Sequence, residues 1–162
     1  MFKAIYLTQD EEKKVTSSIA DVDEADLPDH NVAIDVEYST INYKDGLAIM
    51  GRPGVVRNYP MIPGVDFSGT VIESQNLKYK KDDRVILNGW GVGEKHYGGF
   101  AEYARIKSDW LIKMPEVLNF ENSMIIGSAG YTAALCVLRI LDNIKNNKSG
   151  DILISGASGG VG

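Results

Sequence analysis

The run ILISGASGGVG at residues 152–162 places aliphatic, strand-like sequence directly before a glycine-rich turn. Glycines let a backbone approach a phosphate closely, and a helix after such a turn points its positive N-terminus at the phosphate. A glycine cluster without that context is usually a surface loop. Because an aliphatic strand precedes the cluster here, we predict a strand at residues 152–155 and a phosphate-binding turn at residues 156–162.

The residues before this run predict two helices that lead into the strand. The second is apolar on most of its circumference, so we expect it to be covered on several sides. Residues 119–162 therefore read as the opening of an α/β domain. The elements expected are a helix at 120–127 with Asn119 as its N-cap, a turn at 127–130, a helix at 131–144 and a polar loop at 145–151.

Residues 1–118 predict a second, mainly β domain of a barrel or sandwich type. In the clearest strand, residues 31–39, apolar and charged side chains alternate, which predicts a half-buried strand. NYKDGLAIMG at residues 42–51 predicts a short helix that ends at Gly51. The other strands are expected at residues 2–8, 65–74, 83–88, 100–106 and 110–114.

Composition excludes several classes of protein. The chain has 162 residues, a net charge of −5 and 44% hydrophobic residues, which predicts a globular protein that does not bind nucleic acid. Its apolar runs are broken before they reach the length of a bilayer, so no membrane span is expected. Cys136, the single cysteine, excludes an internal disulfide and a cysteine-rich zinc site, and a cytoplasmic protein is the simplest interpretation.

Three stretches carry side chains suited to chemistry. INYKDG (41–46) packs an amide, a phenol, an ammonium and a carboxylate together, although a capped surface turn would look similar. Asp66 lies between Val65 and Phe67, where an outward-facing carboxylate is commoner than a buried one with a partner. Residues 89–103 form a loop rich in glycine and aromatic residues that suits the rim of a binding site or a solvent-facing connection, with Trp90 packed on the β domain in the second case. No cysteine or second histidine lies near His96 in sequence, so we expect no metal.

Taken in order, the motifs of the whole chain resemble the medium-chain dehydrogenase/reductase superfamily. The resemblance is to its zinc-free quinone oxidoreductase branch and, within that, to acryloyl-CoA reductases. It implies a GroES-like catalytic domain at residues 1–118, a partly open β barrel with short helices, and the first helices and first strand of a truncated Rossmann domain at 119–162. The motifs are INYKDG (41–46), IPGVDFSGTV (62–71), DDRV (82–85), GGFAEY (98–103), IIGSAGYTAA (125–134) and ISGASGGVG (154–162).

The resemblance also implies a metal-free site. Zinc alcohol dehydrogenases of this superfamily carry a cysteine where Asn42 stands, and Gly-His-Glu where this chain has Gly64-Val65-Asp66. Family members are about twice as long as this chain, because a nucleotide domain needs roughly 150 residues. We therefore expect the chain to be an N-terminal portion that is inactive by itself.

For the complete protein, the resemblance implies NADPH-dependent reduction of an activated carbon–carbon double bond, with acryloyl-CoA giving propionyl-CoA. Asn42 and Tyr43 are expected to supply donors near nicotinamide and substrate. Asp45 and Asp66 are expected to order these donors, and relay of the proton by one of the two is a further option. Lys44 or an arginine outside the chain would be the partner of a buried aspartate. The cofactor-binding residues implied are Tyr43, Thr132, Ser158, Gly159, Gly160 and Val161.

Two other functions stay open at this point. One is an NADPH:quinone oxidoreductase with the same fold and cofactor. The other is a GroES-like binding or assembly module without catalysis, although such a module would not need the NYKD and GVDFSG groups. The partners expected are a small-molecule substrate, either an acyl-CoA or a quinone, and a second copy of the chain in a homodimer.

Overall fold

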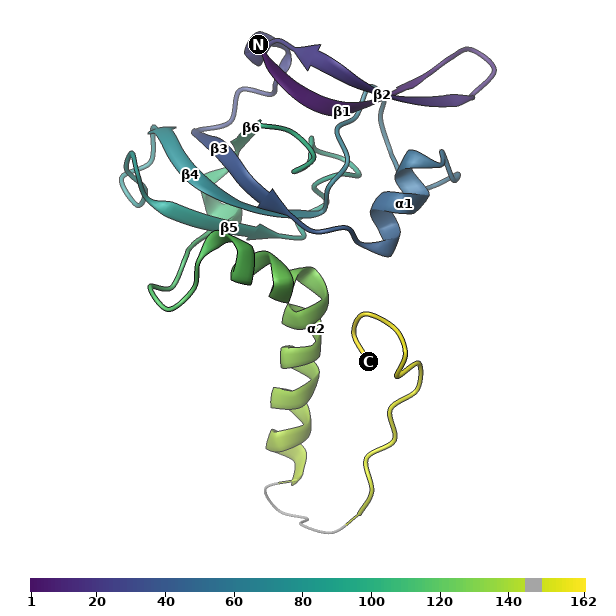
Figure 1. Ribbon diagram of the computed structural model, residues 1–162, viewed down its shortest axis with the longest axis vertical. Coiled ribbons are helices and arrows are strands. Elements are labelled where there is room, and N and C mark those ends of the chain that lie inside the picture. Colours follow the sequence, from purple (N-terminus) through teal and green to yellow (C-terminus); the bar gives the residue numbers. More distant parts are fainter. Residues whose placement is uncertain (145–149) are drawn as a thin grey trace.

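The computed structural model describes residues 1–144 and 150–162, so most of the loop expected at residues 145–151 lies outside the described residues. The described part is mainly β, with one long helix that leads away from the sheets (Figure 1). The strands are β1 (Phe2–Gln9), β2 (Val15–Val22), β3 (Val32–Ser39), β4 (Asp66–Ser74), β5 (Arg84–Asn88), β6 (Tyr103–Ile106) and β7 (Leu111–Lys113), and the α-helices are α1 (Tyr43–Ile49) and α2 (Phe120–Ile144).

The strands form two antiparallel sheets. β3, β4, β5, β6 and β7 make a five-stranded sheet in the order β6-β3-β4-β5-β7, and β1 pairs with β2 in a separate hairpin. Single bridges, Ala4 to Ala101 and Leu7 to Met61, join the hairpin to the rest of the domain. The predicted strands at 2–8, 31–39, 65–74, 83–88, 100–106 and 110–114 are all confirmed, with β6 and β7 shorter than expected. Sequence analysis missed β2.

The strand at 31–39 alternates as predicted only in part, because Ala33 is buried as well as its neighbours. Val32 and Ile34 are fully buried in the core of the five-stranded sheet, whereas Tyr38 is exposed. The pairing with β4 shifts register between Val36 and Tyr38, which is a β-bulge or a similar irregularity. Such a shift re-aims the side chains that follow it, and it carries the end of β3 toward α1.

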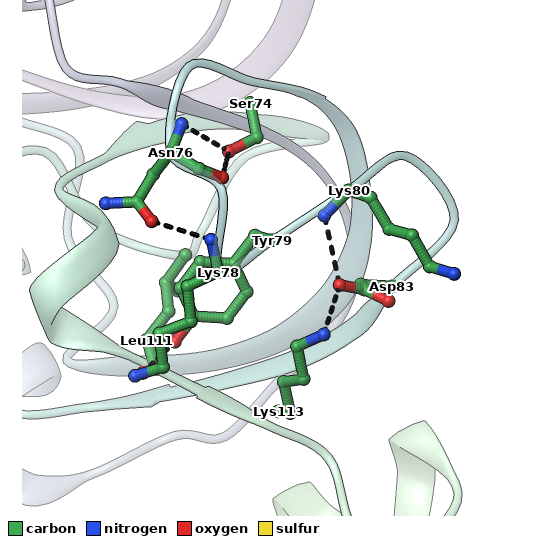
Figure 2. Close-up of polar contacts among 8 residues, drawn as sticks. All are labelled: Ser74, Asn76, Lys78, Tyr79, Lys80, Asp83, Leu111 and Lys113. Atoms are coloured by element: carbon green, nitrogen blue, oxygen red, sulfur yellow. Dashed lines mark hydrogen bonds and ion pairs between the residues drawn. The ribbon is translucent and has the colours of Figure 1, made fainter.

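The connection between β4 and β5 is tied to β7 by two side chains (Figure 2). The buried Tyr79 donates its hydroxyl to the carbonyl oxygen of Leu111, and Asp83 binds the Lys113 ammonium at 2.8 Å. The hydrogen bond from Lys113 lowers the pKa of the Asp83 carboxyl. These contacts hold β7 at the edge of the sheet, at the side from which the chain continues into α2.

The two helices predicted at 120–127 and 131–144 are both present, joined at Gly127 into the element α2. It is kinked at Gly127, whose φ of 49° and ψ of −159° are not helical. Asn119 caps it as predicted, since the Asn119 side-chain oxygen accepts from the Asn122 N–H at 2.7 Å. The chain thus turns at one residue rather than through the four-residue turn expected at 127–130.

Beyond the kink, α2 leaves the β domain (Figure 1). Its apolar side chains there are largely uncovered. Leu135, Leu138 and Leu141 are all exposed. By length and composition alone α2 is apolar enough to cross a membrane, a test that the core helix of a globular domain also passes. The strand predicted at 152–155 is absent: these residues belong to no sheet within the described parts of the chain. A strand of that kind forms only by pairing with neighbours.

Candidate active site

A cleft lies where the end of β3, the start of α1, the kink of α2 and the glycine-rich segment meet. Its volume is about 360 Å³, and no charged side chain lines it. It brings together five residues predicted for the site from distant parts of the sequence. The lining residues are Ile41, Asn42, Tyr43, Ser128, Ala129, Thr132, Gly160 and Val161.

Asp66 is the centre of a hydrogen-bond network behind this cleft. It is fully buried at the start of β4, so the outward-facing interpretation is wrong. One carboxylate oxygen accepts from the Thr40 hydroxyl at 2.6 Å and from the Thr40 N–H at 3.2 Å. The other accepts from the Ser128 N–H at 2.8 Å and from the Asn42 amide at 3.2 Å. Asp66 therefore joins β3, α1 and α2 at the floor of the cleft.

Asn42 contributes its amide group to the same network. Its Nδ2 donates to Thr40 Oγ1 at 3.1 Å as well as to Asp66, so both amide hydrogens are engaged within the protein. In this arrangement the side chain holds the network and does not donate to a ligand. Asn42 stands at the N-cap of α1, immediately before Tyr43.

Asp45 lies one step further from the cleft and binds only backbone groups. It accepts from the N–H groups of Gly64 and Val65, both at 3.1 Å, and from the Asn42 N–H at 2.8 Å. Burial raises the pKa of the Asp45 carboxyl, the backbone N–H donors oppose that rise, and the charge of Asp66 adds to it. Asp45 thus fixes the start of α1 against the turn that precedes β4.

The expectation that Lys44 pairs with a buried aspartate is wrong. Its ammonium binds Glu94 at 2.8 Å at the protein surface, because α1 points this side chain toward the loop at 89–103 and away from Asp45 and Asp66. Within residues 1–144 and 150–162, the two buried carboxylates bind backbone N–H groups, the Thr40 hydroxyl and the Asn42 amide, and no cation.

Tyr43 on α1 and Thr132 on α2 line the cleft from its two sides. The Tyr43 side chain is 85% exposed, and its hydroxyl makes no hydrogen bond to any residue in 1–144 or 150–162. The Thr132 hydroxyl donates to the Ser128 carbonyl one turn earlier in α2, at 2.8 Å. Tyr43 is therefore the polar side chain best placed to donate to a ligand in the cleft.

The glycine-rich segment forms a tight turn beside α2. Gly156 has a φ of 69°, and the Gly159 N–H donates to its carbonyl at 2.9 Å. A Cβ on Gly162 would lie 2.5 Å from Ala157 Cα, so the turn leaves no room for a side chain there. Gly160 and Val161 line the cleft, Gly159 lines a more apolar cavity of about 610 Å³ along α2, and Ser158 is exposed outside both linings.

Sequence analysis missed two members of the network, Thr40 and Ser128. Thr40 immediately precedes the INYKDG motif, and Ser128 is the residue after the kink glycine, at a position assigned to a turn. The Asn88 amide at the end of β5 lies 3.4 Å from the Ser128 hydroxyl. The signal available was a serine next to a glycine at the start of an apolar helix, which marks a backbone N–H free to bind a carboxylate.

The loop at 89–103 packs on the β domain rather than on the cleft. Trp90 stacks on Trp110 with ring centroids 6.3 Å apart, yet 60% of its surface remains exposed. The ring centroids of His96 and His30 lie 6.2 Å apart, although the two residues are far apart in sequence. Burial lowers the pKa of both imidazoles. Among the residues described, no three histidine, cysteine, aspartate or glutamate side chains gather as metal ligands would.

Comparison with known proteins agrees with this architecture. The family model of the alcohol dehydrogenase GroES-like domain matches residues 28–116. The chain belongs to this family, within the medium-chain dehydrogenase/reductase superfamily. Its close relatives there are acrylyl-CoA reductases and quinone oxidoreductases, as the resemblance predicted.

Three relatives define this similarity. The probable acrylyl-CoA reductase AcuI of Escherichia coli is 48% identical over 96% of this chain and 48% of its own length. The putative quinone oxidoreductase YhfP of Bacillus subtilis is 41% identical over 91% of this chain and 45% of its own. The crystal structure of the yhdH oxidoreductase of Salmonella enterica in complex with NADP superposes with a TM-score of 0.92 at 46% identity, covering 98% of this chain and 49% of that one. The chain thus spans about half the length of the relatives it matches.

Proposed function

We propose that these 162 residues are the catalytic β domain and the first part of the cofactor-binding domain of an NADPH-dependent reductase. The reductase acts on an activated carbon–carbon double bond, with acryloyl-CoA as the substrate. One observation carries the proposal: a single uncharged cleft is lined by Tyr43, Thr132 and the glycine-rich turn, in a chain 48% identical to an acrylyl-CoA reductase. The proposed activity is that of a longer protein, which also has the second half that the relatives contain and these 162 residues do not.

The glycine-rich turn fits a dinucleotide. It is tight, carries no side chain at Gly159, Gly160 or Gly162, and lies against the first turn of α2 beyond the kink, with Gly160 facing Ala129. The backbone N–H groups of Ser158, Gly159, Gly160 and Val161 would hold the pyrophosphate. Tyr43 and Thr132 would flank the nicotinamide, because both line the cleft at the mouth of that turn.

NADPH held by these residues would supply the hydride that the β-carbon of the alkene accepts. As negative charge develops on the thioester oxygen, it needs a hydrogen-bond donor. The Tyr43 hydroxyl is the exposed donor in the lining and takes this role, and it or a water molecule gives the α-carbon its proton. Asp66 acts through Thr40, Asn42 and Ser128, which it holds in place, while Asp45 fixes the helix that carries Tyr43.

A specific observation also favours reduction of a quinone, since the YhfP relative is a putative quinone oxidoreductase. That protein has been crystallised with NAD and superposes with a TM-score of 0.92 at 39% identity, so the choice of nicotinamide cofactor needs the same test. A GroES-like module without catalysis is the third alternative.

One assay separates these functions. The full-length protein is mixed with NADPH or NADH and with acryloyl-CoA, a benzoquinone or no acceptor, and cofactor oxidation is followed by absorbance. We expect rapid oxidation of NADPH with acryloyl-CoA and formation of propionyl-CoA. Preference for the quinone would favour the second function, and no oxidation with any pair would favour the third. Tyr43→Phe should lower kcat, and an unchanged kcat would remove the hydroxyl from the mechanism.

We infer further that the protein is cytoplasmic and forms a homodimer. The apolar face of α2, which includes Leu135, Leu138 and Leu141, needs cover, and the remaining half of the chain or a second copy would provide it. Light scattering after size-exclusion chromatography of the full-length protein measures the dimer directly, and a monomer at micromolar concentration would contradict it.

A further inference from the structure

Another cavity lies at the opposite end of α1 from the cleft, and its charged side chains are all basic. Its volume is about 190 Å³, and Lys13, Arg52 and Arg57 line it together with Gln9 and Tyr59. No carboxylate belongs to the lining. This concentration of positive charge stands out in a chain whose net charge is −5.

The backbone around this cavity is held in place by close contacts. Gly51, just after α1, has a φ of 66°, and a Cβ there would lie 2.7 Å from Val15 Cβ at the start of β2. The segment after α1 is therefore pressed against the β1–β2 hairpin. The Gln9 side chain donates to the Lys13 carbonyl at 3.3 Å, which links the end of β1 to the hairpin turn.

The three cations have no internal partner. In the described ranges 1–144 and 150–162, neither Lys13, Arg52 nor Arg57 forms an ion pair, whereas Lys3, Lys44 and Lys113 do. The acidic residues of the same hairpin turn, Asp10, Glu11 and Glu12, are exposed and do not line the cavity. Two guanidinium groups and an ammonium around one hollow suit a phosphate, which guanidinium binds through paired hydrogen bonds.

The cavity is fixed relative to the cleft. Glu94 binds the Lys44 ammonium on α1 through its side chain, and its carbonyl accepts from the Arg57 N–H at 2.8 Å. From Tyr43 to Gly51 the chain advances roughly 12 Å at the rise of an α-helix. Figure 1 shows α1 spanning from the side of α2 to the side of the β1–β2 hairpin. A ligand that occupies both sites must therefore be long.

We propose that Lys13, Arg52 and Arg57 bind the 3′-phosphorylated ADP end of an acyl-CoA thioester while its acyl group lies in the cleft beside Tyr43. This inference rests on the proposed reduction of such a thioester. The cavity is smaller than the roughly 300–1,000 Å³ of pockets that enclose a whole ligand, which suits one end of a long one. The half-buried Tyr59 ring offers a face for the adenine.

The test uses the full-length protein with Arg52→Gln and Arg57→Gln combined. We expect the KM for acryloyl-CoA to rise about tenfold with little change in kcat, because charge-assisted phosphate contacts are lost far from the reacting atoms. The N-acetylcysteamine thioester of acrylate has no nucleotide, so its KM should stay the same. Added salt should raise the KM for acryloyl-CoA in the wild type more than in the variant.

Two controls identify the source of the phosphate. Lys80→Gln combined with Lys81→Gln removes the same charge from the β4–β5 connection and should leave the KM for acryloyl-CoA unchanged. The KM for NADPH, which also carries a phosphorylated ADP, should be unchanged in the Arg52/Arg57 variant. A rise in the KM for NADPH would assign the cavity to the cofactor and overturn the proposal, as would an unchanged KM for acryloyl-CoA or an equal rise for the short thioester.

A calorimetric titration with adenosine 3′,5′-bisphosphate separates this inference from the proposed function. If the wild type reduces neither thioester, the proposed function fails, and the titration then decides the cavity alone. Binding by the wild type that is lost in the Arg52/Arg57 variant supports the cavity as a site for this nucleotide. Absence of binding by the wild type overturns it.

Discussion

The carboxylate of Asp66 accepts a hydrogen bond from the backbone N–H of Ser128 at 2.8 Å, across 62 positions of sequence. The bond ties the start of β4 to the first residue after the kink in α2. Since Ser128 and Asn42 both line the cleft and both donate to Asp66, one buried carboxylate holds two of its walls.

Asp66→Asn should weaken this junction and slow the enzyme. An amide presents an N–H where the carboxylate accepted bonds, so buried donors lose their partner at a cost of about 1–3 kcal/mol. We expect a lower melting temperature and, in the full-length protein, a fall in kcat of similar free energy. Asp35→Asn, at an exposed position of β3, is the matched control. A large drop in melting temperature with unchanged kcat would make Asp66 purely structural.

Gly127→Ala should destabilise the protein more than a typical glycine substitution. The φ of 49° is unfavourable for alanine, and its Cβ would lie 3.0 Å from Thr40 Oγ1, the hydroxyl that donates to Asp66. Gly54→Ala is the control, because Gly54 also has a positive φ, of 82°, but nothing lies within 4 Å of its added Cβ. Urea unfolding of both variants should show the larger loss of stability, by about 1 kcal/mol, for Gly127→Ala. Equal losses would show that the contact with Thr40 is unimportant.

Because of Asp45, we expect a contribution to the free energy of unfolding that falls as pH rises. Its pKa in the folded protein is raised above the ordinary 3.8, mainly by burial, so the folded state holds its proton to higher pH than the unfolded chain does. The contribution of Asp45 is therefore most favourable below the ordinary pKa and is lost as pH increases through the raised one. The free energy of unfolding of the wild type, minus that of Asp45→Asn, should decrease over this interval. A difference that grows with pH would mean that the N–H donors outweigh burial.

The full-length protein should contain no stoichiometric zinc. Asn42 and Val65 stand where zinc alcohol dehydrogenases of this superfamily have ligands, and the Asn42 amide donates both its hydrogens to Thr40 and Asp66. Elemental analysis of purified protein measures this directly, and NADPH oxidation should persist after treatment with a chelator. One tightly bound zinc per chain would contradict the prediction.

The strands of the β domain were predictable because each carries enough apolar residues to mark it. β2 was not, since half of its sequence VTSSIADV is polar and most of its residues are exposed in the hairpin. The strand expected at 152–155 has the composition of a buried parallel strand, but pairing depends on neighbours that composition does not supply. Local pattern therefore identifies what a segment can form, and the contacts available to it decide whether it does.

The sequence predicted which residues lie at the candidate site better than it predicted what each of them does there. Tyr43, Thr132, Gly160 and Val161 line one cleft, and their role in cofactor binding stays a prediction. The burial of Asp66 contradicts the commoner pattern. Alternation fails there because the first residues of β4 are covered on both faces, by the sheet core and by α2. The donors that make this burial tolerable, from Thr40 and Ser128, come from separate segments, and no spacing in the sequence relates them to Asp66.

The kink at Gly127 divides α2 into a short arm, residues 120–126, and a long arm, residues 128–144. Its short arm is fixed, because the Ser68 hydroxyl donates to the Phe120 carbonyl at 3.1 Å and Asn119 caps the first turn. Its long arm, Ser128–Ile144, extends roughly 25 Å at the rise of an α-helix, so a rotation of about 10° at the pivot would carry its far end about 4 Å. Ser128, Ala129 and Thr132 lie close to the pivot and would move far less. Such a rotation would leave the spacing between Tyr43 and Thr132 nearly constant.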